Sequence, residues 1–321
     1  MQKKAVIIGI SGQDGAYLAL HLLKKGYLVY GTSRDVEACS FGSLRALGII
    51  EKIKLCSLSL TDFRSVLENL TKIEPDEVYN LAAQSSVRMS FEQPIETLES
   101  ISVATLNILE VLRFAGLKAK FYNACSSECF GNTNGVPANE ETPFRPRSPY
   151  AVAKAAAFWK VTTYRESYGL FACSGILFNH DSPLRPERFV TQKIVVSAVR
   201  IKKGLQNKLH LGDLSISRDW GWAPDYVDAM WRMLQQKQPE DFVIATGVAN
   251  RLEEFVETVF SSLNLNWRDH VIRDHSLDRP SDLQSSLGDA SKAETTLGWR
   301  ATKYMHEVAS SMVKHQIDKA L

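Results

Sequence analysis

The 321-residue sequence has no run of eighteen or more apolar residues, which is the length that a membrane-spanning helix requires. It also lacks the short apolar stretch after a basic start that is typical of a secretion signal. We therefore expect a soluble, cytoplasmic protein that does not bind membranes. The formal net charge is only +2 and the basic residues are scattered, so the chain also lacks the basic stripe of a nucleic-acid-binding protein.

Cysteine is scarce, and its number is odd. The five cysteines are Cys39, Cys56, Cys125, Cys129 and Cys173. Three of them lie in apolar or strand-like stretches, which favours reduced thiols in the core over a disulfide framework. Cys125 and Cys129 are not followed by a second cluster of cysteine or histidine, so we expect no metal site.

A strand-like segment at residues 3–10, apolar from Ala5 to Ile8, leads directly into a glycine-rich segment, and a helical pattern at 16–25 follows. In this context glycines permit a tight turn and let the backbone approach a pyrophosphate. The spacing Gly-x-x-Gly-x-x-Gly is the variant found in short-chain dehydrogenase/reductase proteins. The segment therefore predicts a dinucleotide site at Gly9, Gly12, Gln13, Asp14 and Gly15.

Strand and helix patterns then alternate along the first half of the chain. Further strands are predicted at residues 28–32, 53–58, 77–81, 120–124 and 172–178, and helices at 62–71, 97–115 and 150–168. Strict alternation predicts an α/β fold with a Rossmann-type, doubly wound parallel sheet.

The alternation of strands and helices ends after Asn179. A segment rich in proline and arginine begins at residue 181. Helices are predicted at 191–203 and 304–319, with one more strand at 242–246. We expect residues 1–178 to form an NADP-binding domain, which residues 220–250 rejoin. Residues 179–321 are expected to form most of a smaller C-terminal domain that binds the substrate.

The end of the second strand bears on cofactor choice. Sites specific for NAD usually offer an acidic residue to the adenosine ribose at this point, whereas this chain has Arg34. A guanidinium can hold a 2′-phosphate through charge-assisted hydrogen bonds, which favours NADP. Asp35 argues the other way, because a carboxylate repels phosphate.

Tyr150 and Lys154 lie four residues apart at the start of a predicted helix, so both side chains share one helix face. Ser148 suits the N-cap and Pro149 the first helical position. The positive helix end and the nearby ammonium are expected to lower the pKa of the phenol. Tyr150 would then act as an acid and base toward a sugar hydroxyl.

Several motifs together resemble the GDP-mannose 4,6-dehydratases, which are extended short-chain dehydrogenase/reductase enzymes. They are YNLAAQS at 79–85, FYNA at 121–124, PRSPY at 146–150, YRESYG at 164–169, GILFNH at 175–180 and RDWG at 218–221. The similarity runs almost end to end and fades at residues 32–48 and 266–280.

The resemblance implies a lyase that converts a GDP-linked hexose to its 4-keto-6-deoxy form. Ser126 would bond the sugar 4-hydroxyl, and Tyr150, assisted by Lys154, would remove its proton as hydride leaves C4 for NADP. Glu128 would take the C5 proton and protonate the departing 6-hydroxyl, after which hydride returns to C6. Glu128 separates this chemistry from that of related epimerases and reductases.

The resemblance also implies further binding residues. Leu81, Ala82 and Ala83 would line the cofactor together with Tyr150 and Lys154. Ser85, Asn179 and Lys193 would lie near the sugar and the base, and Arg218 and Arg279 would hold the two phosphates. Arg185 is a further candidate, whereas His180 is expected to be a packed or hydrogen-bonded histidine.

The chain departs from the family pattern at Ser59, Asp35, Gln192 and Pro186, so the identity of the sugar stays open. A GDP-heptose or another nucleotide sugar is an alternative substrate. A 4-keto sugar reductase or epimerase, and a nucleotide-binding module without activity, are alternative functions.

Family members pair through two helices that match residues 97–115 and 150–168, which implies a homodimer or homotetramer. Leu106, Leu109, Val111 and Phe158 would either form the outer face of these helices or belong to the core.

Overall fold

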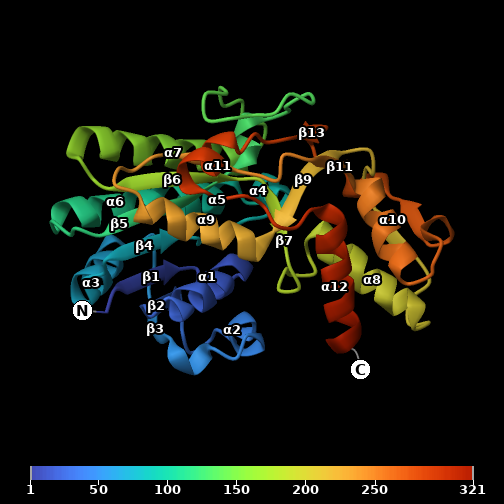
Figure 1. The fold of residues 1–321 in the computed structure, drawn as a ribbon, viewed down its shortest axis with the longest axis horizontal. Coiled ribbons are helices and arrows are strands. Elements are labelled where there is room, and N and C mark those ends of the chain that lie inside the picture. The colour runs from blue at the N-terminus through green and yellow to red at the C-terminus, as the bar shows by residue number, and fades with distance from the viewer. Residues whose placement is uncertain (1, 320–321) are drawn as a thin grey trace.

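The structure, a computed structural model, describes residues 2–319. Its centre is a parallel sheet of seven strands (Figure 1). In order across the sheet these are β10 (Phe242–Ile244), β6 (Ala172–Leu177), β5 (Lys120–Ser126), β4 (Glu77–Asn80), β1 (Lys4–Ile8), β2 (Leu28–Ser33) and β3 (Lys54–Ser57). The prediction of a doubly wound parallel sheet is confirmed.

Helices cover both faces of the sheet. One face carries α1 (Gln13–Lys24), α2 (Gly42–Ala46), α9 (Ala223–Gln235) and α11 (Ser291–Leu297), and the other carries α3 (Phe63–Ile73), α6 (Ala104–Phe114) and α7 (Pro149–Tyr168). The apolar run of β1 shows why the sheet lies between two layers. Ala5 and Ile7 pack into the core beneath α1, whereas Val6 and Ile8 pack into the core beneath α3, because successive side chains point to opposite faces.

The helix predicted at 97–115 is divided in the structure. It consists of α5 (Pro94–Leu98), one π turn (Glu99–Val103) and α6. The ammonium of Lys160 donates to the backbone carbonyl of Ser102 at 2.9 Å and to its hydroxyl at 2.6 Å. The contact ties this irregular turn to α7, the helix that carries Lys160.

The four side chains considered for an outer face belong to the subunit interior. Leu109 and Val111 are fully buried and Phe158 is nearly so. Leu106 is partly buried and packs against the same core as α3 and α6. The sequence left open whether these side chains form an outer helix face or belong to the core, and the structure places them in the core.

The second half of the chain builds a smaller cluster beside the carboxyl ends of the sheet strands (Figure 1). Its strands are β7 (Asn179–Asp181), β8 (Leu209–Leu211), β9 (Ser217–Trp222), β11 (Ala249–Arg251), β12 (Val271–Arg273) and β13 (Ser285–Ser286). Its helices are α8 (Val190–Lys202), α10 (Leu252–Ser262) and α12 (Met305–Lys319). The strand predicted at 242–246 is shorter than expected, because Thr246 leaves the sheet to donate to Asp219. The division of the chain after residue 178 stays a prediction.

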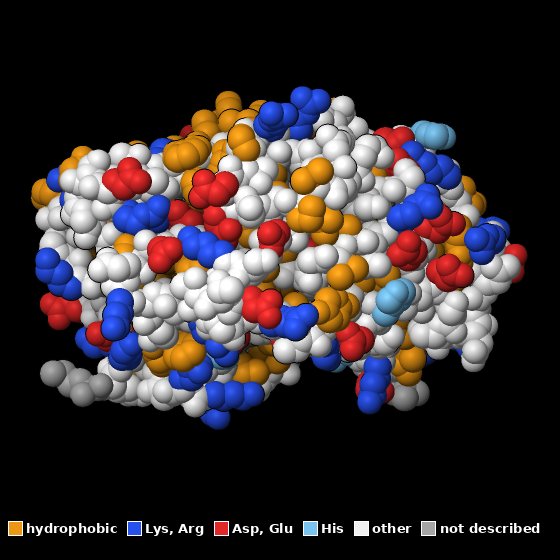
Figure 2. Space-filling view, turned by 45° about the horizontal axis from the view of Figure 1, so that its top comes forward, with side chains coloured by type: hydrophobic (Ala, Val, Ile, Leu, Met, Phe, Trp, Pro, Cys, Tyr) orange, Lys and Arg blue, Asp and Glu red, His pale blue; other side chains and the backbone are white. Residues whose placement is uncertain are grey.

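Charged side chains of both signs are interspersed over the face shown in Figure 2. Among residues 2–319, no helix combines the length and the apolar character needed to cross a membrane. The same residues contain no group of three or more histidine, cysteine or acidic side chains placed to hold a metal ion.

Candidate active site

The glycine-rich turn joins β1 to α1 in a conformation that side chains would obstruct. Gly9 has φ +89°, and a Cβ atom there would lie 2.7 Å from the amide nitrogen of Ala82. At Gly15, a Cβ atom would lie 2.6 Å from the Cα atom of Ile10. These glycines therefore let the turn, the loop after β4 and the first turn of α1 approach closely.

Gly12 has a different environment. It is the N-cap of α1, and a Cβ atom at Gly12 would meet only the carbonyl oxygen of Gly9 at 3.5 Å. The backbone at the start of the helix is thus accessible to a ligand, and a helix N-terminus favours a phosphate. This geometry fits the pyrophosphate of a dinucleotide, with Leu81, Ala82 and Ala83 forming the adjacent, partly buried wall.

The side chains of Gln13 and Asp14 point toward β7 and the residues that follow it. Gln13 donates to the carbonyl oxygen of His180 at 3.2 Å and accepts from the hydroxyl of Ser182 at 2.7 Å. Asp14 lies 3.0 Å from the Nε2 atom of His180. These contacts tie the turn to the second half of the chain, and a direct contact of the two residues with a cofactor stays a prediction.

The Asp14–His180 pair shifts the pKa of both groups. Burial by itself raises the pKa of Asp14, but the charge and hydrogen bond of His180 outweigh it and lower that pKa to about 2. Burial lowers the pKa of His180, yet Asp14 and the carbonyl of Phe178 raise it overall. His180 also stacks on Tyr226 with ring centroids 4.3 Å apart, which confirms that it is packed and hydrogen-bonded.

Helix α7 places Tyr150 and Lys154 beside the end of β5. The Ser148 hydroxyl accepts from the amide of Ala151 at 3.1 Å, and Pro149 follows it, so the helix begins as the sequence predicts. The Nζ atom of Lys154 donates to the carbonyl of Ala124 at 2.7 Å and lies 5.8 Å from the centroid of the Tyr150 ring.

The lowered phenol pKa expected from the sequence is wrong for this structure. Burial raises the pKa of Tyr150 above its usual value, and the hydrogen bond with Ser126 opposes that rise only in part. Burial also lowers the pKa of Lys154. Both side chains are more than nine-tenths buried, and desolvation disfavours a phenolate and an ammonium alike.

Ser126 ends β5, and Glu128 follows in a short 3₁₀ turn (Ser127–Phe130). The Ser126 hydroxyl accepts from the amide of Glu128 at 3.3 Å, which fixes the spacing of the two residues. Burial raises the pKa of Glu128, whereas the charges of Arg218 and Arg279 lower it and that of Asp282 raises it. A carboxyl group in this setting is suited to holding a proton.

The two predicted phosphate ligands come from separate segments and meet near Glu128. Arg218 lies in β9 and is 4% exposed, whereas Arg279 precedes β13 and is about one-third exposed. Both donate to the same oxygen of Asp282, at 2.8 Å and 3.3 Å. Asp282 was not predicted from the sequence, although its position three residues after Arg279 could have indicated an ion pair.

The remaining predicted residues are more dispersed. Ser85 is exposed in the loop after β4, and Asn179 begins β7 in register with Trp220. Lys193 donates to the carbonyl of His210 at 2.6 Å. Arg185 forms an ion pair of 3.0 Å with Asp181.

Arg34 lies exposed just after β2. Its neighbour Asp35 accepts hydrogen bonds from the amides of Glu37 at 2.9 Å and Ala38 at 3.1 Å. The Asp35 carboxylate, which was expected to repel the 2′-phosphate of NADP, is therefore turned to the local backbone.

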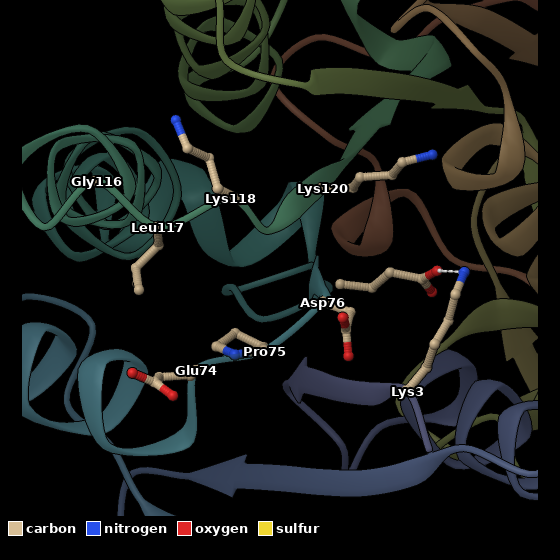
Figure 3. Close-up of a pocket in the computed structure, with 9 residues that line it drawn as sticks. Lys3, Glu74, Pro75, Asp76, Gly116, Leu117, Lys118 and Lys120 are labelled. Atoms are coloured by element: carbon tan, nitrogen blue, oxygen red, sulfur yellow. Dashed lines mark hydrogen bonds and ion pairs between the residues drawn. The ribbon is translucent and has the colours of Figure 1, made fainter. Parts of the chain in front are cut away.

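A surface hollow of 410 Å³ lies at the other end of the sheet strands, beside the amino ends of β1, β4 and β5 (Figure 3). Lys3 forms an ion pair there with Glu77 at 3.2 Å. Glu77 also accepts from the hydroxyls of Tyr27 and Tyr79. Ligands of open parallel sheets bind beyond the carboxyl ends of the strands, so this hollow is not the candidate active site.

Known proteins resemble the chain over its whole length. Residues 6–312 match the sequence profile of the family described as GDP-mannose 4,6 dehydratase. GDP-mannose 4,6 dehydratase 2 of Arabidopsis thaliana is 47% identical, over 99% of this chain and 88% of the relative. GDP-mannose 4,6-dehydratase of Vibrio cholerae is 43% identical, over 100% of this chain and 95% of the relative.

Solved structures agree on the fold. UDP-glucose 4-epimerase of Thermus thermophilus, in complex with NAD, superimposes with a TM-score of 0.86 at 25% identity, covering 98% of this chain and 99% of that chain. RMD of Pseudomonas aeruginosa, in complex with NADPH, gives a TM-score of 0.82 at 23% identity, covering 99% of each chain. With the family profile and the full-length relatives, these findings show that the chain belongs to the GDP-mannose 4,6-dehydratase family.

Proposed function

We propose that this protein is a lyase that converts GDP-mannose to its 4-keto-6-deoxy form with the help of a bound nicotinamide cofactor. The observation that carries the proposal is the position of Glu128, two residues after Ser126 and at the same strand end as Tyr150 and Lys154. A reductase or an epimerase of this fold has no use for that carboxyl. The names of the full-length relatives support the same substrate.

In this proposal each side chain handles one proton or one hydrogen bond. Ser126 holds the 4-hydroxyl of the sugar, and Tyr150 takes its proton. Lys154, anchored on the Ala124 carbonyl, keeps the phenol oriented. Glu128 removes the C5 proton, which the neighbouring ketone acidifies, and returns a proton to the departing 6-hydroxyl, so that water leaves. A bound nicotinamide cofactor would supply hydride acceptance from C4 and hydride donation to C6, so that no net redox change would result.

The diphosphate of the substrate is assigned to Arg218 and Arg279. Guanidinium groups match phosphate oxygens in pairs, and the positive charges of both arginines lower the pKa of Glu128. This supports a single substrate that reaches from these arginines to that carboxyl. Ser85, Asn179 and Lys193 are proposed to contact the sugar and the base.

NADP is the proposed form of the cofactor. The exposed guanidinium of Arg34 is available at the end of β2, where the adenosine ribose is bound in this fold. Asp35 accepts from the amides of Glu37 and Ala38, so its carboxylate is held by the local backbone. Gly9, Gly12 and Gly15 would admit the pyrophosphate.

The protein is proposed to be a homodimer or a homotetramer. The exposed apolar side chains Ile95, Leu98, Val103, Val152 and Trp159 lie on α5, the π turn and α7, which pack against one another. Exposed apolar side chains on neighbouring elements are typical of an interface between copies of a chain. The five free cysteines fit a reducing, cytoplasmic location.

A Glu128→Gln variant tests the proposed function. We expect it to bind GDP-mannose and the cofactor almost normally but to form no 4-keto-6-deoxy product, because the amide cannot accept the C5 proton. Glu141→Gln removes an exposed carboxylate from the next loop and should leave product formation unchanged. Unimpaired dehydration by Glu128→Gln would remove this residue from the mechanism.

The absorbance of free NADPH separates the alternatives. Product formation without stoichiometric cofactor consumption supports a dehydratase, whereas consumption indicates a 4-keto sugar reductase. A panel that includes a GDP-heptose identifies the preferred sugar, and no turnover of any member would indicate a binding module.

A further inference from the structure

One carboxylate oxygen organises both proposed phosphate ligands. The Oδ1 atom of Asp282 accepts from the Nη2 atom of Arg218 at 2.8 Å and from the Nη1 atom of Arg279 at 3.3 Å. It also accepts from the amide of Leu283 at 2.9 Å. Two positive groups from distant segments are therefore held together by a single negative one.

The two arginines differ in how firmly they are held. Arg218 is buried and also donates to the carbonyls of Ser217 at 3.0 Å and Leu283 at 2.7 Å. Within residues 2–319, Asp282 is the one hydrogen-bond acceptor of Arg279. Asp282 therefore completes the hydrogen bonding of Arg218 and accepts the one side-chain hydrogen bond that Arg279 makes within residues 2–319.

The same three groups act on Glu128. The charged and titratable side chains that influence it are Arg218 from β9, Arg279 and Asp282 from the segment before β13, and Tyr150 from α7. The arginines favour the ionised carboxyl, whereas burial and Asp282 favour the protonated one. The equilibrium between the ionised and the protonated carboxyl of Glu128 thus depends on how much of the arginines' positive charge acts on it.

We propose that Asp282 is a positioning residue that orients Arg218 and Arg279 and, through them, sets when Glu128 carries its proton. The inference rests on the proposed function, because it assigns the substrate diphosphate to these arginines. A bound diphosphate adds negative charge beside them and cancels part of their effect on Glu128. The carboxyl therefore holds a proton more readily once the substrate is in place.

This timing suits the proposed elimination. The C5–H bond breaks as an O–H bond forms on Glu128, and that O–H bond then breaks as the proton joins the departing 6-hydroxyl. One proton enters the carboxyl and one leaves it, so the site returns to its starting state with the loss of one water. A carboxyl held ionised by two unopposed arginines would be a weaker base and would retain the proton less well.

The test follows the ionisation of Glu128 directly. Infrared difference spectra between the wild type and Glu128→Gln, both with bound NADP, report the protonated carbonyl band of Glu128 as a function of pH. In the wild type, we expect saturating GDP to move the midpoint of this titration to higher pH. Asp282→Asn keeps an oxygen for the arginines but loses the charge, so its midpoint should move to lower pH, and the acidic limb of kcat should move with it.

Two further variants control for structural effects. Asp282→Glu keeps the charge and should restore the wild-type midpoint. Asp278→Asn breaks an ion pair of the same segment, with Arg273 at 2.7 Å, and should leave the midpoint unchanged. If Asp282 had only a structural role, Asp282→Asn would lower the melting temperature without shifting the titration.

The inference and the proposed function fail in different ways. A midpoint that stays in place in Asp282→Asn, or upon GDP binding to the wild type, overturns the inference even if Glu128→Gln is inactive. Dehydration by Glu128→Gln overturns the proposed function. Should Asp282→Asn fold poorly, the absence of a GDP-dependent shift in the wild type or in Asp282→Glu still overturns the inference.

Discussion

The Nε2 atom of His180 lies 3.0 Å from the Oδ2 atom of Asp14, across 166 positions of the sequence. Asp14 belongs to the first turn of α1, beside the glycine-rich loop, and His180 belongs to β7, where the second half of the chain begins. The pair therefore joins the proposed cofactor site to the proposed substrate site.

The stability that this pair provides should depend on pH. The lowered pKa of Asp14 means that its contribution is present above 3.8, the ordinary value, and is lost as pH falls toward 2. The raised pKa of His180 means that its contribution is present below 6.5 and is lost as pH rises through the folded-state value. We expect Asp14→Asn to lower the free energy of unfolding by about 2 kcal/mol near pH 5 and by less near pH 9. Urea unfolding at both values measures the difference.

A surface ion pair provides the control for that experiment. Glu187 and Arg200 are 2.6 Å apart but about half exposed, so Glu187→Gln should cost less than about 1 kcal/mol at either pH. Equal losses for Asp14→Asn at the two pH values would contradict the assignment of an ion pair.

Capping of α7 should affect catalysis as well as stability. Ser148 accepts from the amide of Ala151, and its replacement by alanine should cost about 1 kcal/mol. Asp62 caps α3 in the same way, through the amide of Arg64, so Asp62→Ala should cost a similar amount. Only Ser148→Ala should lower kcat, because Tyr150 lies in the first turn of α7. A comparable fall in kcat for both variants would argue against the role of that turn.

Two glycines of the first loop should respond differently to alanine. Gly9→Ala places a Cβ atom 2.7 Å from the Ala82 nitrogen at φ +89°, so it should lower the free energy of unfolding by more than about 1 kcal/mol. Gly12→Ala meets no such obstacle and should fold normally, but its methyl group would weaken dinucleotide binding at the helix N-terminus. Urea unfolding and NADPH fluorescence titration separate the two effects. Normal NADPH affinity in Gly12→Ala would place the pyrophosphate elsewhere.

Arg34 should determine the preference for NADP over NAD. Charge-assisted hydrogen bonds contribute roughly 1.5 to 3 kcal/mol, so Arg34→Ala should weaken NADPH binding by about ten- to a hundred-fold and leave NADH binding nearly unchanged. Arg64→Ala removes an exposed guanidinium that pairs with Glu68 and serves as the control. Equal weakening of both cofactors would show that Arg34 does not contact the 2′-phosphate.

The proposed interface can be tested with one charge. Trp159 is 58% exposed on α7, and Trp159→Glu should dissociate the oligomer, because burying an unpaired carboxylate is costly. Leu205 is 74% exposed after α8, outside the apolar surface, and Leu205→Glu should leave the mass unchanged. Sedimentation velocity or light scattering measures the result, and a wild type that is monomeric at high concentration would refute the proposal.

The sequence predicted the elements of the sheet and the residues of the catalytic turn because these depend on local rules. A few neighbouring residues suffice to predict the apolar strand β1, the helix N-cap at Ser148 and the shared helix face of Tyr150 and Lys154. It did not predict the pKa of Tyr150, because burial by surrounding segments outweighs the helix end and Lys154. The π turn after α5 was likewise missed, since the contact from Lys160 comes from another helix.

The sequence by itself determined the fold class and the identity of the proposed reacting groups, because strand and helix periodicity and motif spacing are properties of neighbouring residues. Only the tertiary structure decided which distant charges meet. Asp14 reaches His180, and Asp282 reaches both Arg218 and Arg279, because the second half of the chain folds over the carboxyl ends of the sheet. Charges that are separated in sequence interact strongly only when folding brings them together and removes the water between them.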